Sequence, residues 1–180
     1  QIGQDAQAGY GLFGLVDGYL LLNEFYPVIP VYDDEGWNVE IPSENADLPH
    51  YDASLYEVTI SAPERVTLVA SGVASDRSRR DARQTATYRI GPARHFYFAA
   101  SDAYALLSAR EGRTTINAYA PSAYRQGAER VVEVAAAALR SFGERFGTYP
   151  YTELDVIAAP LGSLGMEYPG LVVIRLELYD

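Results

Sequence analysis

The spacing of apolar residues changes near Pro121, and this change limits the folds that the chain can adopt. Before Pro121, apolar and polar residues alternate in short segments separated by turn residues, which is typical of strands in an antiparallel sandwich or barrel. After it, apolar residues recur every three or four positions, which is typical of an amphipathic helix. The sequence therefore predicts a mainly β protein with a C-terminal α/β portion.

Several segments of the first region are rich in β-branched and aromatic residues, and we expect them to be strands. They are 55–60, 66–70, 85–90, 95–99, 104–108 and 114–119. In the second region we predict one long helix from Ser122, the expected N-cap, to Phe146, which Gly147 follows as a stop signal. The apolar runs 154–159 and 171–176 then predict two buried strands.

The predicted helix and these two strands do not form a complete core by themselves. A two-stranded ribbon is marginal without further partners. We therefore expect the native chain to continue beyond Asp180, and we expect the helix and the last two strands to expose apolar surface.

The overall charge and composition exclude several kinds of partner. The formal net charge is −10 and every basic residue is an Arg, so an acidic surface should repel nucleic acid. The chain has no Cys, which removes disulfides, thiolate catalysis and cysteine-ligated zinc. Apolar runs such as Leu20–Leu22 are far shorter than the roughly 20 residues that span a bilayer, so membrane insertion is not expected.

No pattern in the chain predicts a metal site or a catalytic nucleophile. His50 and His95 are not at helical spacing, so we expect structural roles for both. The acidic segment 33–36 lacks the ligand spacing of a calcium loop and predicts a turn. Ser163 does not fit Gly-x-Ser-x-Gly, and the arginine run 77–83 predicts a solvated hairpin tip. We therefore assign no catalytic residue and no metal ligand.

Glu167 is the residue that most suggests a function. It stands between Met166 and Tyr168 and between the two apolar runs of the second region. A carboxylate in such surroundings is either paired or faces a cleft, where it accepts strong hydrogen bonds from an ammonium group. The alternative is a surface-loop glutamate without a partner.

Three consecutive segments resemble the zinc aminopeptidase family typified by aminopeptidase N. They are Phe-Gly-Thr-Tyr-Pro-Tyr at 146–151, the strand at 154–156, and Gly-Met-Glu-Tyr-Pro-Gly at 165–170. In that family the last segment is the Gly-x-Met-Glu-Asn exopeptidase motif, with Gly-Gly-Met-Glu-Tyr-Pro-Gly as its bacterial variant. The segments 23–27 and 94–102 also resemble the family's N-terminal β domain.

The resemblance implies a domain division and a substrate-binding segment. Residues 1–120 would be the later part of an N-terminal antiparallel β-sandwich or saddle domain, and 121–180 the beginning of a thermolysin-like catalytic domain. Glu167 would bind the free α-amino group of a peptide, Gly165 and Met166 would offer backbone groups, and Tyr168 would complete the segment. The substrate would be a peptide with a free N-terminus, hydrolysed at its first bond.

The sequence differs from the family motif at one position, and it ends before the positions of the family's zinc ligands. Leu164 stands where the family motif has its first glycine, and the family's zinc ligands lie downstream of the motif. We therefore expect zinc in a longer parent protein but none in these residues, which should be inactive alone and need the remaining catalytic domain in cis. No leader sequence is visible, yet we favour a cell-envelope or extracellular location over the cytoplasm.

Other functions are compatible with the same residues. A protein of this fold that had lost its zinc ligands would serve as a scaffold or would bind peptides without hydrolysing them. An unrelated β-rich interaction module would resemble the motif only by chance.

Overall fold

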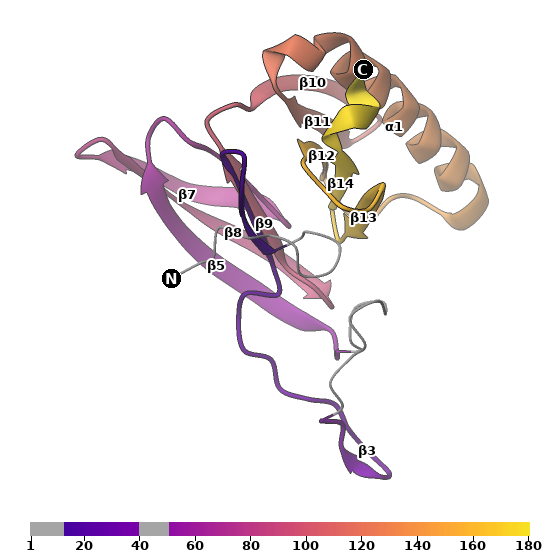
Figure 1. The fold of residues 1–180 in the computed structure, drawn as a ribbon. Helices are drawn as coiled ribbons and strands as arrows, with labels where there is room; N and C mark the ends of the chain where they lie inside the picture. Colours follow the sequence, from indigo (N-terminus) through magenta and orange to yellow (C-terminus); the bar gives the residue numbers. More distant parts are fainter. Residues whose placement is uncertain (1–12, 40–50) are drawn as a thin grey trace.

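A computed structural model describes residues 13–39 and 51–180, so the expectation for His50 lies outside the described residues. The described chain is mainly β with antiparallel sheets and has its α-helix near the C-terminus, as the sequence predicts (Figure 1). The strands are β1 (Phe13–Val16), β2 (Tyr19–Asn23), β3 (Tyr32–Asp33), β4 (Gly36–Trp37), β5 (Ser54–Pro63), β6 (Thr67–Ala70), β7 (Val73–Arg80), β8 (Arg83–Ala93), β9 (Tyr97–Ser101), β10 (Ala105–Glu111), β11 (Thr114–Ala120), β12 (Glu153–Ala159), β13 (Gly165–Tyr168) and β14 (Leu171–Arg175).

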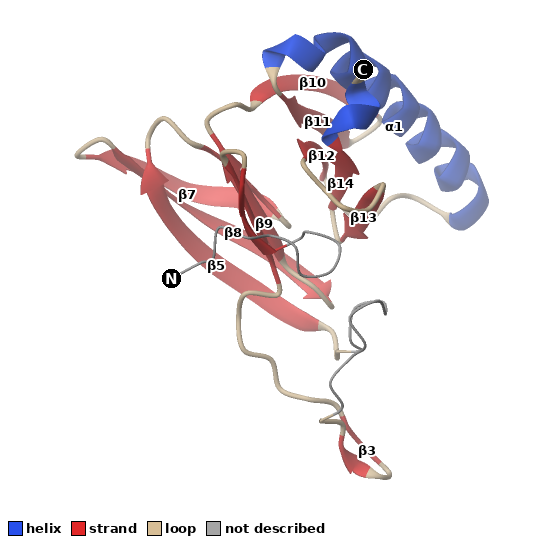
Figure 2. Cartoon of the chain, viewed as in Figure 1, coloured by secondary structure: helices blue, strands red, loops and turns tan. Residues whose placement is uncertain are grey.

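The larger sheets and the helix stack as successive layers (Figure 2). An outer sheet has the strand order β5-β8-β7, a central sheet β1-β2-β9-β6, and a mixed sheet β10-β11-β12-β14-β13. Helix α1 (Arg125–Phe146) covers the far face of the mixed sheet. The short hairpin β3-β4 projects away from these layers, and its acidic turn is closed by the backbone N–H of Glu35, which donates to Asp33 Oδ1 at 2.9 Å.

The central sheet is covered on both faces, which explains why every residue of β9 is buried. On one face lies the phenylalanine core, which joins the central and outer sheets; its buried members are Leu22, Leu68, Ala70, Ala86, Tyr88, Ile90, Ala93, Phe96, Phe98 and Ala100. On the other face lies the tyrosine core, which joins the central and mixed sheets; its buried members are Tyr19, Leu21, Val69, Tyr97, Ala99, Tyr104, Ile157, Ala159, Leu161, Tyr168, Leu171 and Val173.

The mixed sheet extends across the predicted domain boundary at residue 120. Strand β11, which ends at Ala120, pairs in parallel with β12, and α1 makes the crossover between them. The strands β10 and β11 therefore share one sheet with β12, β13 and β14. The division into two domains at this position stays a prediction.

The C-terminal region contains one strand more than the sequence predicts. The segment 165–168 is itself a strand, β13, which pairs antiparallel with β14. The prediction of two strands was wrong here because Glu167 and Gly165 interrupt the apolar pattern by which the neighbouring strands were recognised.

The helix begins later than predicted, and its N-cap prediction was wrong. Residues Ser122–Tyr124 form a short 3₁₀ turn, α1 starts at Arg125, and no side chain caps either element. The stop at Gly147 is confirmed, since this residue has φ 98° and its N–H donates to Gly143 O at 3.2 Å.

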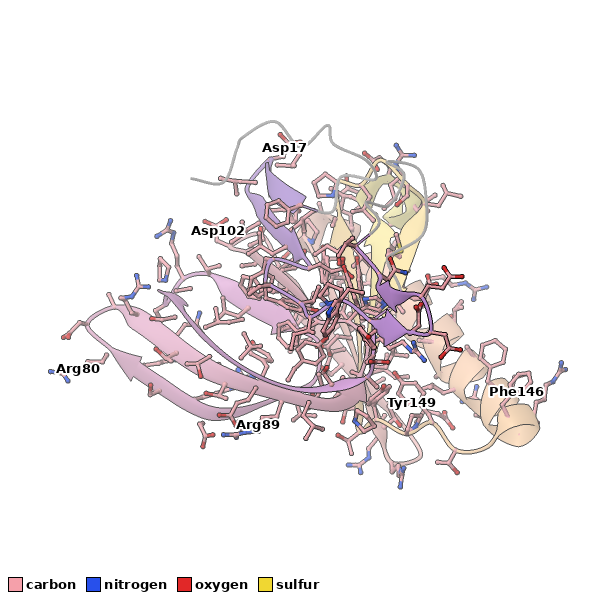
Figure 3. The ribbon with its side chains drawn as sticks, turned by 90° about the horizontal axis from the view of Figure 1, so that it is seen from below. Asp17, Arg80, Arg89, Asp102, Phe146 and Tyr149 are labelled. Atoms are coloured by element: carbon pink, nitrogen blue, oxygen red, sulfur yellow. The ribbon has the colours of Figure 1, made fainter. Side chains whose placement is uncertain are left out.

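The C-terminal end of the helix packs less closely on the sheet than its N-terminal half does. Ala128 in the first half is buried, whereas Phe146 is 82% exposed and lies at the end of the molecule (Figure 3). The chain closes with a 3₁₀ turn, Leu176–Tyr179, that packs against the first half of α1. A Cβ at Gly127 would lie 2.1 Å from Tyr179 O, so only glycine fits this contact.

The hairpin β1-β2 and the strand β7 were not predicted. Asp17 and Gly18 both have positive φ, which matches the Asp-Gly turn of a two-residue hairpin and was a usable signal. The arginine run 77–83 continues β7 and β8 almost to the turn at Asp81, so only its end is a hairpin tip, where Figure 3 shows Arg80.

Candidate functional site

The strand β13 carries the predicted substrate-binding segment and lies at the edge of the mixed sheet. Side chains alternate along it, so Met166 packs against the tyrosine core and Tyr168 is buried in it, while Glu167 is exposed on the opposite face. A tight turn with Gly170 at φ 72° leads into β14. Among the described strands only β14 pairs with β13, so β13 is an edge strand of the mixed sheet within the described residues.

Glu167 forms no ion pair or hydrogen bond with any described residue. Its register partner is Val172, so both side chains lie on the face of the mixed sheet that the helix covers. Gly165 approaches β14 closely, since a Cβ there would lie 2.9 Å from Val173 O. Leu164, the position at which the sequence departs from the motif that it resembles, is 69% exposed. The carboxylate is therefore free to bind a cation from outside the described chain.

An apolar groove of about 600 Å³ lies on the same face as Glu167, between α1 and the strands β12 and β14. Its floor is formed by Leu154, Val156, Val172 and Ile174, and the helix and the segment after it form the wall, through Arg130, Val131, Val134, Ala135, Ala138, Leu139, Phe142, Gly143, Phe146, Gly147, Thr148, Tyr149 and Pro150. Figure 3 shows Tyr149 and Phe146 along this side. The groove confirms that the helix and two of the last strands expose apolar surface.

Tyr168 fixes β13 to the central sheet. Its ring stacks on Tyr97 with centroids 4.5 Å apart and an angle of 20° between the planes. Burial raises the pKa of Tyr168, and the negative charges of Glu24 and Glu167 raise it further. Glu24 is therefore close to the motif, although 143 positions separate it from Glu167 in the printed sequence, counting from 24 to 167.

Glu24 is paired with His95, a residue far from it in the sequence. His95 Nδ1 lies 2.8 Å from Glu24 Oε1, and the Tyr51 hydroxyl donates to Glu24 Oε2 at 3.5 Å. Glu24 has φ 47°, which is uncommon for a residue other than glycine. His95 precedes β9, so the prediction that it lies in a strand was wrong. No local pattern predicts its pairing with Glu24, because 71 positions separate the two residues.

A buried polar row crosses the mixed sheet, and the sequence did not predict it. The Ser108 hydroxyl donates to Asn117 Oδ1 at 2.7 Å, and Asn117 Nδ2 donates to Asp155 Oδ1 at 2.8 Å. Burial raises the pKa of Asp155 to about 7, although the hydrogen bond from Asn117 lowers it. The charge of Glu153 raises this pKa further, and the charge of Arg77 lowers it. Asp155 is thus a buried carboxyl with a raised pKa, and its cross-strand row passes through Leu171 to Tyr168, the residue that follows Glu167.

Residues 13–39 and 51–180 contain no group of three or more His, Asp or Glu side chains that could hold a metal ion. The described residues therefore do not fit a zinc ion. The helix in this part of the chain is not long and apolar enough to span a membrane.

No protein-family model matches the chain, and no curated protein matches it. A function must therefore be inferred from the geometry of β13 and from its motif.

Proposed function

We propose that the chain is part of a zinc-dependent aminopeptidase and carries the segment that binds the N-terminus of a peptide substrate. One observation supports this most directly: among the described residues, Glu167 is exposed and unpaired, on an edge strand whose outer side pairs with no other strand. An unpaired carboxylate beside a strand edge suits the ammonium group of an extended peptide.

The edge of β13 provides the second part of the binding site. An extended peptide that pairs with this edge gains main-chain hydrogen bonds, with Gly165 and Met166 as the neighbouring backbone. The Glu167 carboxylate then fixes the ammonium group, so the first peptide bond lies at a constant distance from it. Tyr168, stacked on Tyr97, anchors the strand from the opposite face.

The apolar groove is where we place the rest of a thermolysin-like catalytic domain. It is bounded by the helix and by the floor of β12 and β14, and it lies on the face that Glu167 shares. In this proposal the following chain covers the groove and supplies the zinc ligands, since the described residues supply none. The role of this chain is then to bind and orient the peptide.

The proposal is tested by Glu167→Gln in the parent protein. We expect kcat/KM for peptides with a free N-terminus to fall by an amount equivalent to about 2–4 kcal/mol, because a charge-assisted contact is lost. Glu144→Gln is the control, since Glu144 is exposed on α1 and forms no ion pair among the described residues. An unchanged kcat/KM in Glu167→Gln would contradict the assignment.

A peptide-binding protein or scaffold is the second candidate, because the free edge and Glu167 suffice for binding without hydrolysis. The two are distinguished by the metal content of the parent protein and by its turnover of a free-N-terminus peptide. A parent that binds such peptides through Glu167, contains no zinc and releases no amino acid would be a binding protein.

A further inference from the structure

The tyrosine core contains hydroxyl groups that no described residue satisfies. The hydroxyls of Tyr97, Tyr104 and Tyr168 are buried, and none has a hydrogen-bond partner among the described residues. In the phenylalanine core the buried Tyr88 differs, since its hydroxyl donates to Leu68 O at 3.1 Å. The buried Tyr179 of the helix's core also has a hydroxyl without a partner among the described residues, but only the tyrosine core contains several such groups.

The three tyrosines belong to one cluster of the core, and the rings of two of them are in contact. Tyr168 stacks on Tyr97, and after burial the charge of Tyr168 is what raises the pKa of Tyr97. Tyr97 in turn raises the pKa of Tyr104. Asn23 is the register partner of Tyr97, and its Oδ1 is also buried without a partner among the described residues. The groups thus come from the central sheet, from β13 and from the connection before β10.

Burying these groups unpaired would be strongly unfavourable. Each buried hydroxyl without a partner lowers the folding equilibrium constant by roughly 5- to 150-fold. Phenylalanine occupies nearly the same space without this penalty, and β9 does carry Phe98 on its other face, while Phe96 immediately precedes the strand. Tyrosine at these positions is therefore explained if something in the core pairs with the hydroxyls.

We propose that Asn23, Tyr97, Tyr104 and Tyr168 enclose a binding site for a water-sized hydrogen-bond donor, which is a water molecule or an ammonium ion. Asn23 Oδ1 can only accept, whereas each phenol can both donate and accept. A buried water typically makes about three hydrogen bonds to such groups. The site joins the central sheet to β13 and is independent of the function proposed for Glu167.

The test compares single hydroxyl deletions in this chain by denaturant unfolding. With a bound donor, Tyr97→Phe and Tyr104→Phe each lower the folding equilibrium constant, by about fivefold, because a satisfied hydrogen bond is lost. Tyr88→Phe is the matched control, since its hydroxyl has a protein acceptor and its loss gives the scale of one bond. An unchanged or raised folding constant in both Tyr97→Phe and Tyr104→Phe would overturn the proposal.

Two further measurements identify the donor and keep the proposal testable if a variant does not fold. Ammonium chloride should stabilise the native chain more than sodium chloride at equal ionic strength if ammonium binds, and this difference should vanish in Tyr97→Phe. Equal stability in both salts identifies water. A high-resolution crystal structure should show a density peak within hydrogen-bond distance of at least two of the named groups, and a core without such a peak would refute the site.

Discussion

The phenylalanine core and the tyrosine core share the central sheet but differ in chemistry. Strand β9 supplies both, with Phe98 on one face and Tyr97 on the other, and both side chains are almost completely buried. The phenylalanine core joins two antiparallel sheets into a sandwich, whereas the tyrosine core joins that sandwich to the mixed sheet that carries β13. Side chains that are equally buried are therefore wholly apolar on one face of β9, whereas on the other face they carry hydroxyl groups without a partner among the described residues.

The largest expected effect comes from emptying the phenylalanine core. Phe96 is fully buried, and Phe96→Ala should lower the free energy of unfolding by about 3–5 kcal/mol through lost contacts and a cavity. Urea unfolding measures this loss directly. If Phe96→Ala lowers the free energy of unfolding no more than Tyr97→Phe does, the distinction between the two cores is wrong, because loss of a whole ring and loss of one hydroxyl would then have the same effect.

A smaller and pH-dependent effect is expected from Asp155 in the mixed sheet. Its folded pKa of about 7 lies above its unfolded value near 4, so the folded state binds more protons between these values. The contribution of Asp155 to the free energy of unfolding is therefore greatest below about pH 4. It is lost as the pH rises to about 7, and the total change is of the order of 2–4 kcal/mol.

Asp155→Asn should remove this slope, since an amide oxygen can still accept from Asn117. Chemical unfolding at several pH values compares the variant with the native chain, and Asp102→Asn on the surface serves as control. Parallel curves for Asp155→Asn and the native chain would show that this carboxyl titrates normally in the folded state.

The smallest effect on stability is expected at the open end of the groove. Phe146 is 82% exposed, so Phe146→Ser should change the free energy of unfolding by less than about 0.5 kcal/mol. The same variant should reduce any self-association of the isolated chain, which sedimentation measures, because it removes apolar surface. A destabilisation as large as that of Phe96→Ala would mean that this side chain belongs to a core.

Local patterns in the sequence predicted much of the fold. The alternating segment 55–60 and the apolar run 154–159 lie within β5 and β12, and Gly147 ends the helix as expected. The strand β13 was not predicted because a glycine and a glutamate break its apolar pattern. Ser122 failed as a cap because the chain makes a 3₁₀ turn before α1 begins.

The candidate site was predicted only where its signal is local. The motif at 165–168 identified Glu167 as a candidate residue. The spacing of apolar residues did not predict that Glu167 is exposed on an edge strand. The pairing of Glu24 with His95 and the stacking of Tyr97 on Tyr168 depend on which sheets face each other. Such contacts join segments far apart in the chain, and nothing in either segment specifies its partner.

The contact between Gly127 and Tyr179 has a consequence for the order in which the protein assembles during synthesis. The buried members of the phenylalanine core end at Ala100, those of the tyrosine core at Val173, and those of the helix's core at Tyr179. Chains fold from the N-terminus as they leave the ribosome. The sandwich can therefore form before the helix is synthesised, and the packing of the helix is complete only after Tyr179 has been synthesised.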